Sequence, residues 1–80
     1  MIFMYNITVY VTNECGACDL TINWMRQHGI EPTEIINVHE DPKQIDILRE
    51  HGYMQFLVVT VNGWDNAWTG VNIERLEELL

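Results

Sequence analysis

Short runs of β-branched and aromatic residues alternate along the chain with segments in which apolar residues recur at helical spacing. The runs predict four strands, at residues 7–11, 33–38, 56–61 and 67–69. Apolar residues three or four positions apart predict three helices, at residues 18–28, 41–51 and 72–80, the last capped by Asn72. The pattern therefore predicts the element order β-α-β-α-β-β-α.

Capping and turn residues indicate where these elements begin and end. Asp41 is expected to cap the second helix, with Pro42 at its first position and Gln44 completing a capping box. Asn62-Gly63 is a strong hairpin signal between the last two strands. Trp64 follows it directly, so we expect an exposed side chain at the hairpin tip.

The order of elements also predicts how the strands pair. Two successive strand–helix–strand units predict parallel pairing through right-handed crossovers, and the hairpin adds an antiparallel edge strand. A chain of 80 residues has room for one small core. We therefore predict a single domain over residues 1–80, of the α/β class, with a four-stranded mixed sheet and helices on both faces.

The two cysteines, in Cys15-Gly16-Ala17-Cys18, lie where the first strand gives way to the first helix. Free backbone N–H groups and the positive end of the helix dipole favour a thiolate at such a position. A CxxC motif after the first strand of such a unit is typical of thioredoxin-like redox proteins. The sequence thus predicts dithiol–disulfide exchange.

Charge limits the classes of partner. The chain has four basic and twelve acidic residues, which gives a net charge of −8. It would therefore repel a phosphate backbone, and nucleic acid is not expected as a partner. No run approaches the roughly 20 apolar residues that span a bilayer, so no membrane partner is expected. The first residues carry no basic signal-peptide region. We expect a cytoplasmic protein whose thiols are reduced at rest.

The sequence favours redox exchange over other roles for the cysteine pair. A purely stabilising disulfide is disfavoured because so short a loop constrains little of the unfolded chain. A zinc site requires four ligands, and His28, His39 and His51 lie far along the chain from the pair. We expect no metal and no cofactor. The alternative is a binding module that holds a partner protein, a metal or an iron–sulfur cluster.

Four further segments make the likeness to one family specific. Thr12-Asn13-Glu14-Cys15, Ile36-Asn37-Val38, Gly52-Tyr53 and Trp68-Thr69-Gly70 closely resemble NrdH-redoxins, from about Thr8 to Leu76. These are glutaredoxin-like proteins of the thioredoxin-fold superfamily that act as hydrogen donors to class Ib ribonucleotide reductase. The resemblance implies a thioredoxin/glutaredoxin-like fold, a ribonucleotide reductase as disulfide substrate, thioredoxin reductase as reductant, and a monomer.

Three positions depart from the family pattern. Gly16-Ala17 stands where the family has Val or Met followed by Gln, and Val71-Asn72-Ile73 stands where it has Phe-Arg-Pro. Leu57 occupies the position of the cis-proline that faces the cysteines in thioredoxin-fold proteins. A cis bond before a non-proline residue costs roughly 3–4 kcal/mol, so a trans Phe56–Leu57 bond is expected. Leu57 is then either a reshaped docking position or simply another core residue.

The resemblance and the chemistry together assign the site residues. Cys15 is the expected nucleophile and Cys18 the expected resolving thiol. No Lys or Arg precedes Arg26, so the glutathione carboxylates lack cations near the motif and thioredoxin reductase is the expected reductant. The resemblance places Trp68 near the active-site surface. It implies a surface for the substrate or partner protein formed by Thr12, Gly16, Ala17, Phe56, Leu57, Val58, Trp68, Thr69 and Gly70.

Overall fold

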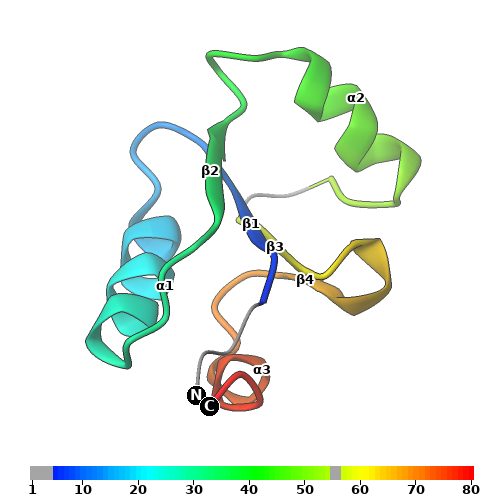
Figure 1. Cartoon of the computed structure of the whole chain (residues 1–80). Coiled ribbons are helices and arrows are strands. Elements are labelled where there is room, and N and C mark those ends of the chain that lie inside the picture. The colour runs from blue at the N-terminus through cyan, green and yellow to red at the C-terminus, as the bar shows by residue number, and fades with distance from the viewer. Residues whose placement is uncertain (1–4, 55–56) are drawn as a thin grey trace.

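A computed structural model describes residues 5–54 and 57–80 of the chain. Its elements follow the predicted order (Figure 1): β1 (Ile7–Val11), α1 (Gly16–Gln27), β2 (Glu34–Asn37), α2 (Lys43–Glu50), β3 (Val58–Val61), the 3-10 turn η1 (Trp64–Asn66), β4 (Ala67–Thr69) and α3 (Ile73–Glu77). The fold is a four-stranded mixed sheet with helices on both faces, which confirms the predicted α/β class.

The strands lie in the order β2-β1-β3-β4. β1 pairs with β2 in parallel and with β3 antiparallel, and β3 pairs with β4 antiparallel. The prediction that the second strand–helix–strand unit is also parallel is therefore wrong. Val11 is opposite Asn37 at the end of β2, and the adjacent Tyr10 is opposite Val58 at the start of β3. α2 thus connects two points at the same end of the sheet, so β3 runs back toward the other end.

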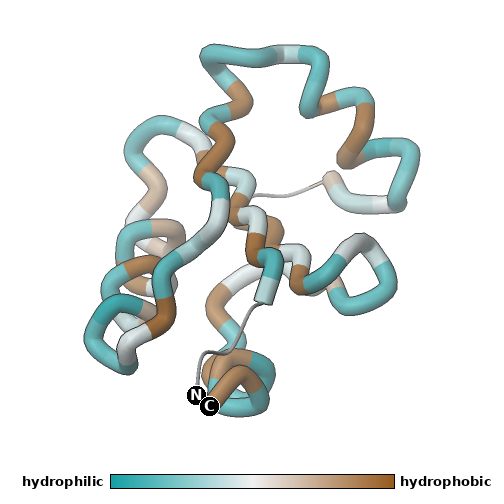
Figure 2. The backbone as a smooth tube through the Cα atoms, in the orientation of Figure 1, coloured by the Kyte–Doolittle hydropathy of each residue, from teal (hydrophilic) through white to brown (hydrophobic). Residues whose placement is uncertain are grey.

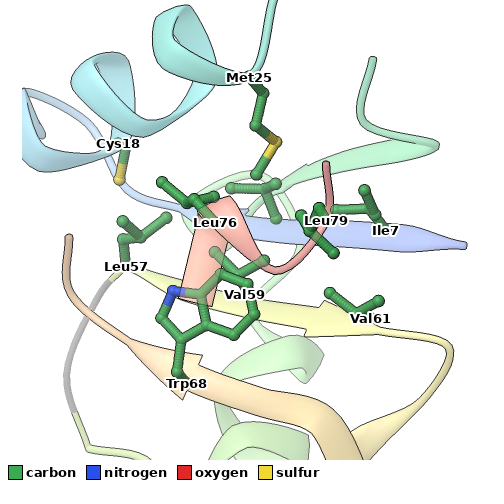
Figure 3. Packing of buried hydrophobic residues seen from close by; sticks show 10 residues of the cluster. Ile7, Cys18, Met25, Leu57, Val59, Val61, Trp68, Leu76 and Leu79 are labelled. Atoms are coloured by element: carbon green, nitrogen blue, oxygen red, sulfur yellow. The ribbon is translucent and has the colours of Figure 1, made fainter. Parts of the chain in front are cut away.

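Two hydrophobic clusters cover the two faces of the sheet. The larger joins α1 and α3 to the sheet and contains Val9, Cys18, Met25, Val59 and Leu76, all at most 2% exposed (Figure 3). The smaller lies on the opposite face, where Leu48 of α2 packs with β-sheet residues. Figure 2 shows hydrophobic residues along the central strands and hydrophilic ones in the outer turns. The cysteine pair therefore lies on the face with the larger cluster.

The helix starts match the predictions in part. Asn72 caps α3, because its Oδ1 accepts the backbone N–H of Arg75 at 3.2 Å. The predicted capping box at α2 is not formed. Asp41 Oδ2 instead accepts the side-chain amide of Gln44 at 3.1 Å, and the helix begins at Lys43 with Pro42 as its flanking residue. The Asp41 carboxylate thus bonds to the Gln44 side chain and not to a backbone N–H of the helix.

No helix in residues 5–54 or 57–80 is long and apolar enough to cross a membrane.

Candidate functional site

Cys15 and Cys18 form a disulfide at the start of α1, with their Cα atoms 5.2 Å apart. Cys15 is the N-cap of the helix, and its Sγ accepts the backbone N–H of Cys18 at 3.1 Å. A serine or aspartate oxygen commonly takes this place at a helix N-terminus. The free N–H groups and the positive end of the helix dipole are therefore directed at a sulfur atom, which favours its thiolate form.

The two sulfurs differ in their access to solvent. Cys15 is half-buried, whereas Cys18 is 2% exposed and belongs to the core cluster under α1. Figure 3 shows Cys18 at the same end of that core as Leu57. An external disulfide can thus approach Cys15 but not Cys18. This arrangement suits exchange through a mixed disulfide, in which one sulfur meets the substrate and the other acts from inside the protein.

The loop that leads into Cys15 is held by a bond from another strand. Glu14 has a positive φ of 56°, which a residue with a side chain rarely adopts. Beside it, Asn13 Oδ1 accepts a hydrogen bond from Asn37 Nδ2 at 3.0 Å, and Asn37 Oδ1 accepts the N–H of His39 at 2.8 Å. Sequence reasoning missed this bridge, although Asn37 lies in the Ile-Asn-Val segment that it had singled out.

The side chain of Leu57, at the position where the resemblance implies a proline, is fully buried in the cluster that contains Cys18. Its carbonyl oxygen accepts the Thr69 hydroxyl at 2.7 Å and the Gly70 N–H at 3.0 Å. Val58 is also fully buried but packs in the cluster on the opposite face. Phe56 and the Phe56–Leu57 bond lie outside the described residues. The side chains of Leu57 and Val58 are therefore core, and a role for either residue in binding a partner stays a prediction.

Trp68 is also less accessible than the resemblance implied. It is 7% exposed and packs in the core with Cys18 and Leu57 (Figure 3), while the Arg75 guanidinium carbon lies 5.1 Å from the centre of its ring. Trp68 thus packs in the same cluster as Cys18, and its contact with a partner stays a prediction. The other predicted partner residues are exposed or half-buried, namely Thr12, Gly16, Ala17, Thr69 and Gly70.

Strand register explains why distant segments meet at this site. β1 ends at Val11, just before the cysteine loop, and its Tyr10 is opposite Val58 of β3. Val58 is in turn opposite Thr69 of β4. The exit of β1, the entry of β3 and the exit of β4 therefore lie at one end of the sheet, and the start of α1 joins them there.

Charge around the pair comes mainly from carboxylates. Glu14 and Asp19 flank the motif and both are exposed. Arg26 is the first basic residue after the motif, but it lies in the last turn of α1, far from the cysteines, and forms an ion pair with Glu31 at 3.1 Å. The helix N-terminus, rather than a neighbouring cation, is therefore the feature that stabilises negative charge on Cys15.

Within residues 5–54 and 57–80, no three His, Cys, Asp or Glu side chains come together in a group suited to hold a metal ion.

Comparison with known proteins gives a consistent result. The glutaredoxin family model matches residues 7–64. The chain is 33% identical over 73 residues to the glutaredoxin-like protein NrdH of Escherichia coli K12, covering 91% of this chain and 86% of that protein. It is 32% identical to NrdH of Lactococcus lactis subsp. cremoris, covering 91% and 97%. The solved structure of Escherichia coli NrdH-redoxin, described as having a thioredoxin-like activity profile, superposes with a TM-score of 0.84 at 33% identity, over 94% and 95% of the two chains.

Proposed function

The chain belongs to the glutaredoxin family as an NrdH-like thiol oxidoreductase, and from this we propose that its Cys15–Cys18 pair reduces disulfides in other proteins. The observation that carries the proposal is the asymmetry of the pair. Cys15 is half-buried and accepts a helix N–H on its sulfur, while Cys18 is 2% exposed directly beneath the same helix turn. One sulfur is placed to attack a substrate and the other to release it.

The proposed reaction has two exchange steps. Cys15 Sγ, as a thiolate, attacks one sulfur of the substrate disulfide, so that the substrate S–S bond breaks and a mixed disulfide forms. Cys18 Sγ then loses its proton and attacks Cys15 Sγ, which breaks the bond between Cys15 and the substrate. Two electrons pass to the substrate, whose two thiolates take up two protons, and the Cys15–Cys18 disulfide is left. A reductant dithiol restores the pair and is itself oxidised.

Reduction of insulin disulfides tests this function. The wild-type protein, supplied with a reductant, is expected to reduce insulin, and Cys15→Ser is expected to abolish turnover. Cys18→Ser is expected to accumulate a mixed disulfide that mass spectrometry detects, since the resolving thiol is gone. A wild-type protein without activity, or a Cys15→Ser variant that retains it, would contradict the proposal.

The proposed physiological substrate is a class Ib ribonucleotide reductase, and the proposed reductant is thioredoxin reductase. The likeness to NrdH proteins supports both. No Lys or Arg precedes Arg26 in the sequence, so a glutathione carboxylate would meet Glu14 and Asp19 instead of cations. Turnover is expected with thioredoxin reductase and NADPH. Turnover with glutathione and glutathione reductase alone would overturn this choice of reductant. We propose that residues 1–80 act as one monomeric domain in the cytoplasm.

Leu57 favours one alternative, a redoxin fold that binds a partner, a metal or an iron–sulfur cluster with little turnover. A buried leucine replaces the proline expected beside the cysteines, and its carbonyl oxygen is already occupied by Thr69 and Gly70. Absence of insulin reduction in both the wild type and Cys15→Ser would favour this function, and a metal-dependent absorbance band would favour its metal form. Higher activity in Leu57→Pro would show that the loop limits turnover.

A further inference from the structure

Thr21 of α1 has a buried hydroxyl group without a hydrogen-bond partner among the described residues. A helical threonine usually directs its hydroxyl to a carbonyl three or four residues earlier, and a buried hydroxyl without a partner is unfavourable. A polar atom left unpaired in a small core needs a specific explanation.

Thr21 lies on the same buried helix face as Cys18. The buried residues of α1 are Cys18, Thr21 and Met25, and Figure 3 shows the first and last of these extending from the helix into one core. Residues three apart in a helix have Cβ atoms about 5–6 Å from each other. Helical side chains also lean toward the N-terminus, so the Thr21 side chain lies over the turn that holds Cys18.

In the disulfide form Cys18 Sγ is neutral and only a weak acceptor, and the Thr21 hydroxyl makes no hydrogen bond to it. Reduction changes this. Cys18 Sγ becomes a thiol or thiolate inside the core, and a buried anionic sulfur requires a hydrogen-bond donor. Cys15 Sγ already receives the N–H of Cys18, whereas no described group donates to Cys18 Sγ. On the buried face of α1, Thr21 carries the side-chain donor without a partner, and Trp68 Nε1 of β4 is a second such donor in the same cluster.

We propose that the Thr21 hydroxyl donates a hydrogen bond to Cys18 Sγ in the reduced protein and has no partner in the disulfide form. Thr21 is thereby a positioning residue for the resolving thiol, and this role rests on the proposed disulfide exchange. The bond favours the reduced state in two ways. It stabilises the thiolate that attacks the mixed disulfide, and its absence leaves a buried hydroxyl unsatisfied in the oxidised state.

Thr21→Val tests the proposal, because valine keeps the shape of threonine and lacks the hydroxyl. The equilibrium constant for exchange with a reference dithiol is expected to shift by roughly tenfold toward the protein disulfide, equivalent to a reduction potential about 30 mV more negative. Urea unfolding is expected to show reduced Thr21→Val less stable than reduced wild type, and oxidised Thr21→Val as stable as oxidised wild type or more so. The thiolate absorbance of Cys18, measured in a Cys15→Ser background, is expected to develop at higher pH in Thr21→Val.

Two variants serve as controls. Thr21→Ser restores the hydroxyl and is expected to return the exchange constant to within about twofold of wild type. Thr60 of β3 is also buried but lies on the sheet face opposite Cys18, since its neighbour Val59 belongs to the cysteine-side cluster. Thr60→Val is expected to shift the stability of both redox states alike and to leave the potential unchanged. A purely structural role for Thr21 would produce that same pattern in Thr21→Val.

An unchanged potential in Thr21→Val, or a Thr21→Ser variant that behaves like Thr21→Val, would overturn the inference. Should Thr21→Val fail to fold, the wild-type protein still gives an answer by NMR. The Thr21 hydroxyl proton is expected to exchange with water more slowly in the reduced form than in the oxidised form, and equal or faster exchange would refute the bond. Insulin reduction by the wild type, measured in the same samples, tests the proposed function separately.

Discussion

Asn37 Nδ2 donates a hydrogen bond of 3.0 Å to Asn13 Oδ1, and this bond joins the end of β2 to the loop that presents Cys15. The loop contains Glu14 in a left-handed conformation, which is strained for any residue with a Cβ atom. A strained loop keeps its shape only when its surroundings hold it. The Asn13–Asn37 bridge is one such restraint on the nucleophilic sulfur, and it comes from a segment 24 residues away in sequence.

Removing either side of this bridge is expected to slow disulfide exchange. Asn13→Ala and Asn37→Ala should each lower the initial rate of insulin reduction roughly two- to tenfold, because one exposed hydrogen bond contributes about 0.5–1.5 kcal/mol. The double variant should be no slower than the slower single variant, since both changes break the same bond. Strictly additive losses would show that the two asparagines act independently.

Leu57→Ala is expected to destabilise the protein. The side chain is fully buried beside Cys18, so its truncation leaves a cavity and should lower the free energy of unfolding by about 2–5 kcal/mol. Urea denaturation measures the change. Leu20→Ala is the matched control, because Leu20 on α1 is 58% exposed and its truncation should cost less than about 0.5 kcal/mol. Similar losses in the two variants would contradict the placement of Leu57.

Thr69 stabilises the segment around Leu57 through its hydroxyl group. Thr69→Val removes the 2.7 Å hydrogen bond to the Leu57 carbonyl oxygen, which keeps only the N–H of Gly70. The free energy of unfolding is expected to fall by about 0.5–1.5 kcal/mol. Thr69→Ser retains the hydroxyl and should stay closer to wild type. A valine variant as stable as the wild type would contradict a contribution from the hydroxyl.

The Tyr10 hydroxyl is expected to make the folded protein less stable as pH rises above 10. Burial, together with the nearby Glu34 carboxylate, raises the pKa of the Tyr10 hydroxyl above its ordinary value of 10.0. Above pH 10 the unfolded chain therefore releases this proton more readily than the folded protein, so stability is lost as pH rises through that range. Tyr10→Phe keeps the ring that stacks on Trp64 and should weaken the loss, as thermal unfolding between pH 9 and 11 would show. An unchanged pH profile in this variant would exclude Tyr10 as the source.

The side chain of Trp64 is more buried than its position in the sequence predicts. Its position after Asn62-Gly63 predicts an exposed hairpin tip, yet the side chain is half-buried. Its ring centre lies 5.5 Å from that of Tyr10 and 4.0 Å from that of His51. Trp64 therefore connects the β3–β4 turn to the end of α2. Neither ring partner is near Trp64 in the sequence, so no periodicity could reveal the stack.

The sequence by itself determined the type and order of the elements and put Cys15 at a helix N-terminus. These features depend on interactions within a few residues, such as the capping of α1 by Cys15 and of α3 by Asn72. Only the tertiary structure decided the direction of β3, the burial of Trp68 and the Asn13–Asn37 bridge. Each of these depends on where a connecting helix returns the chain to the sheet, and that follows from packing between segments far apart in sequence.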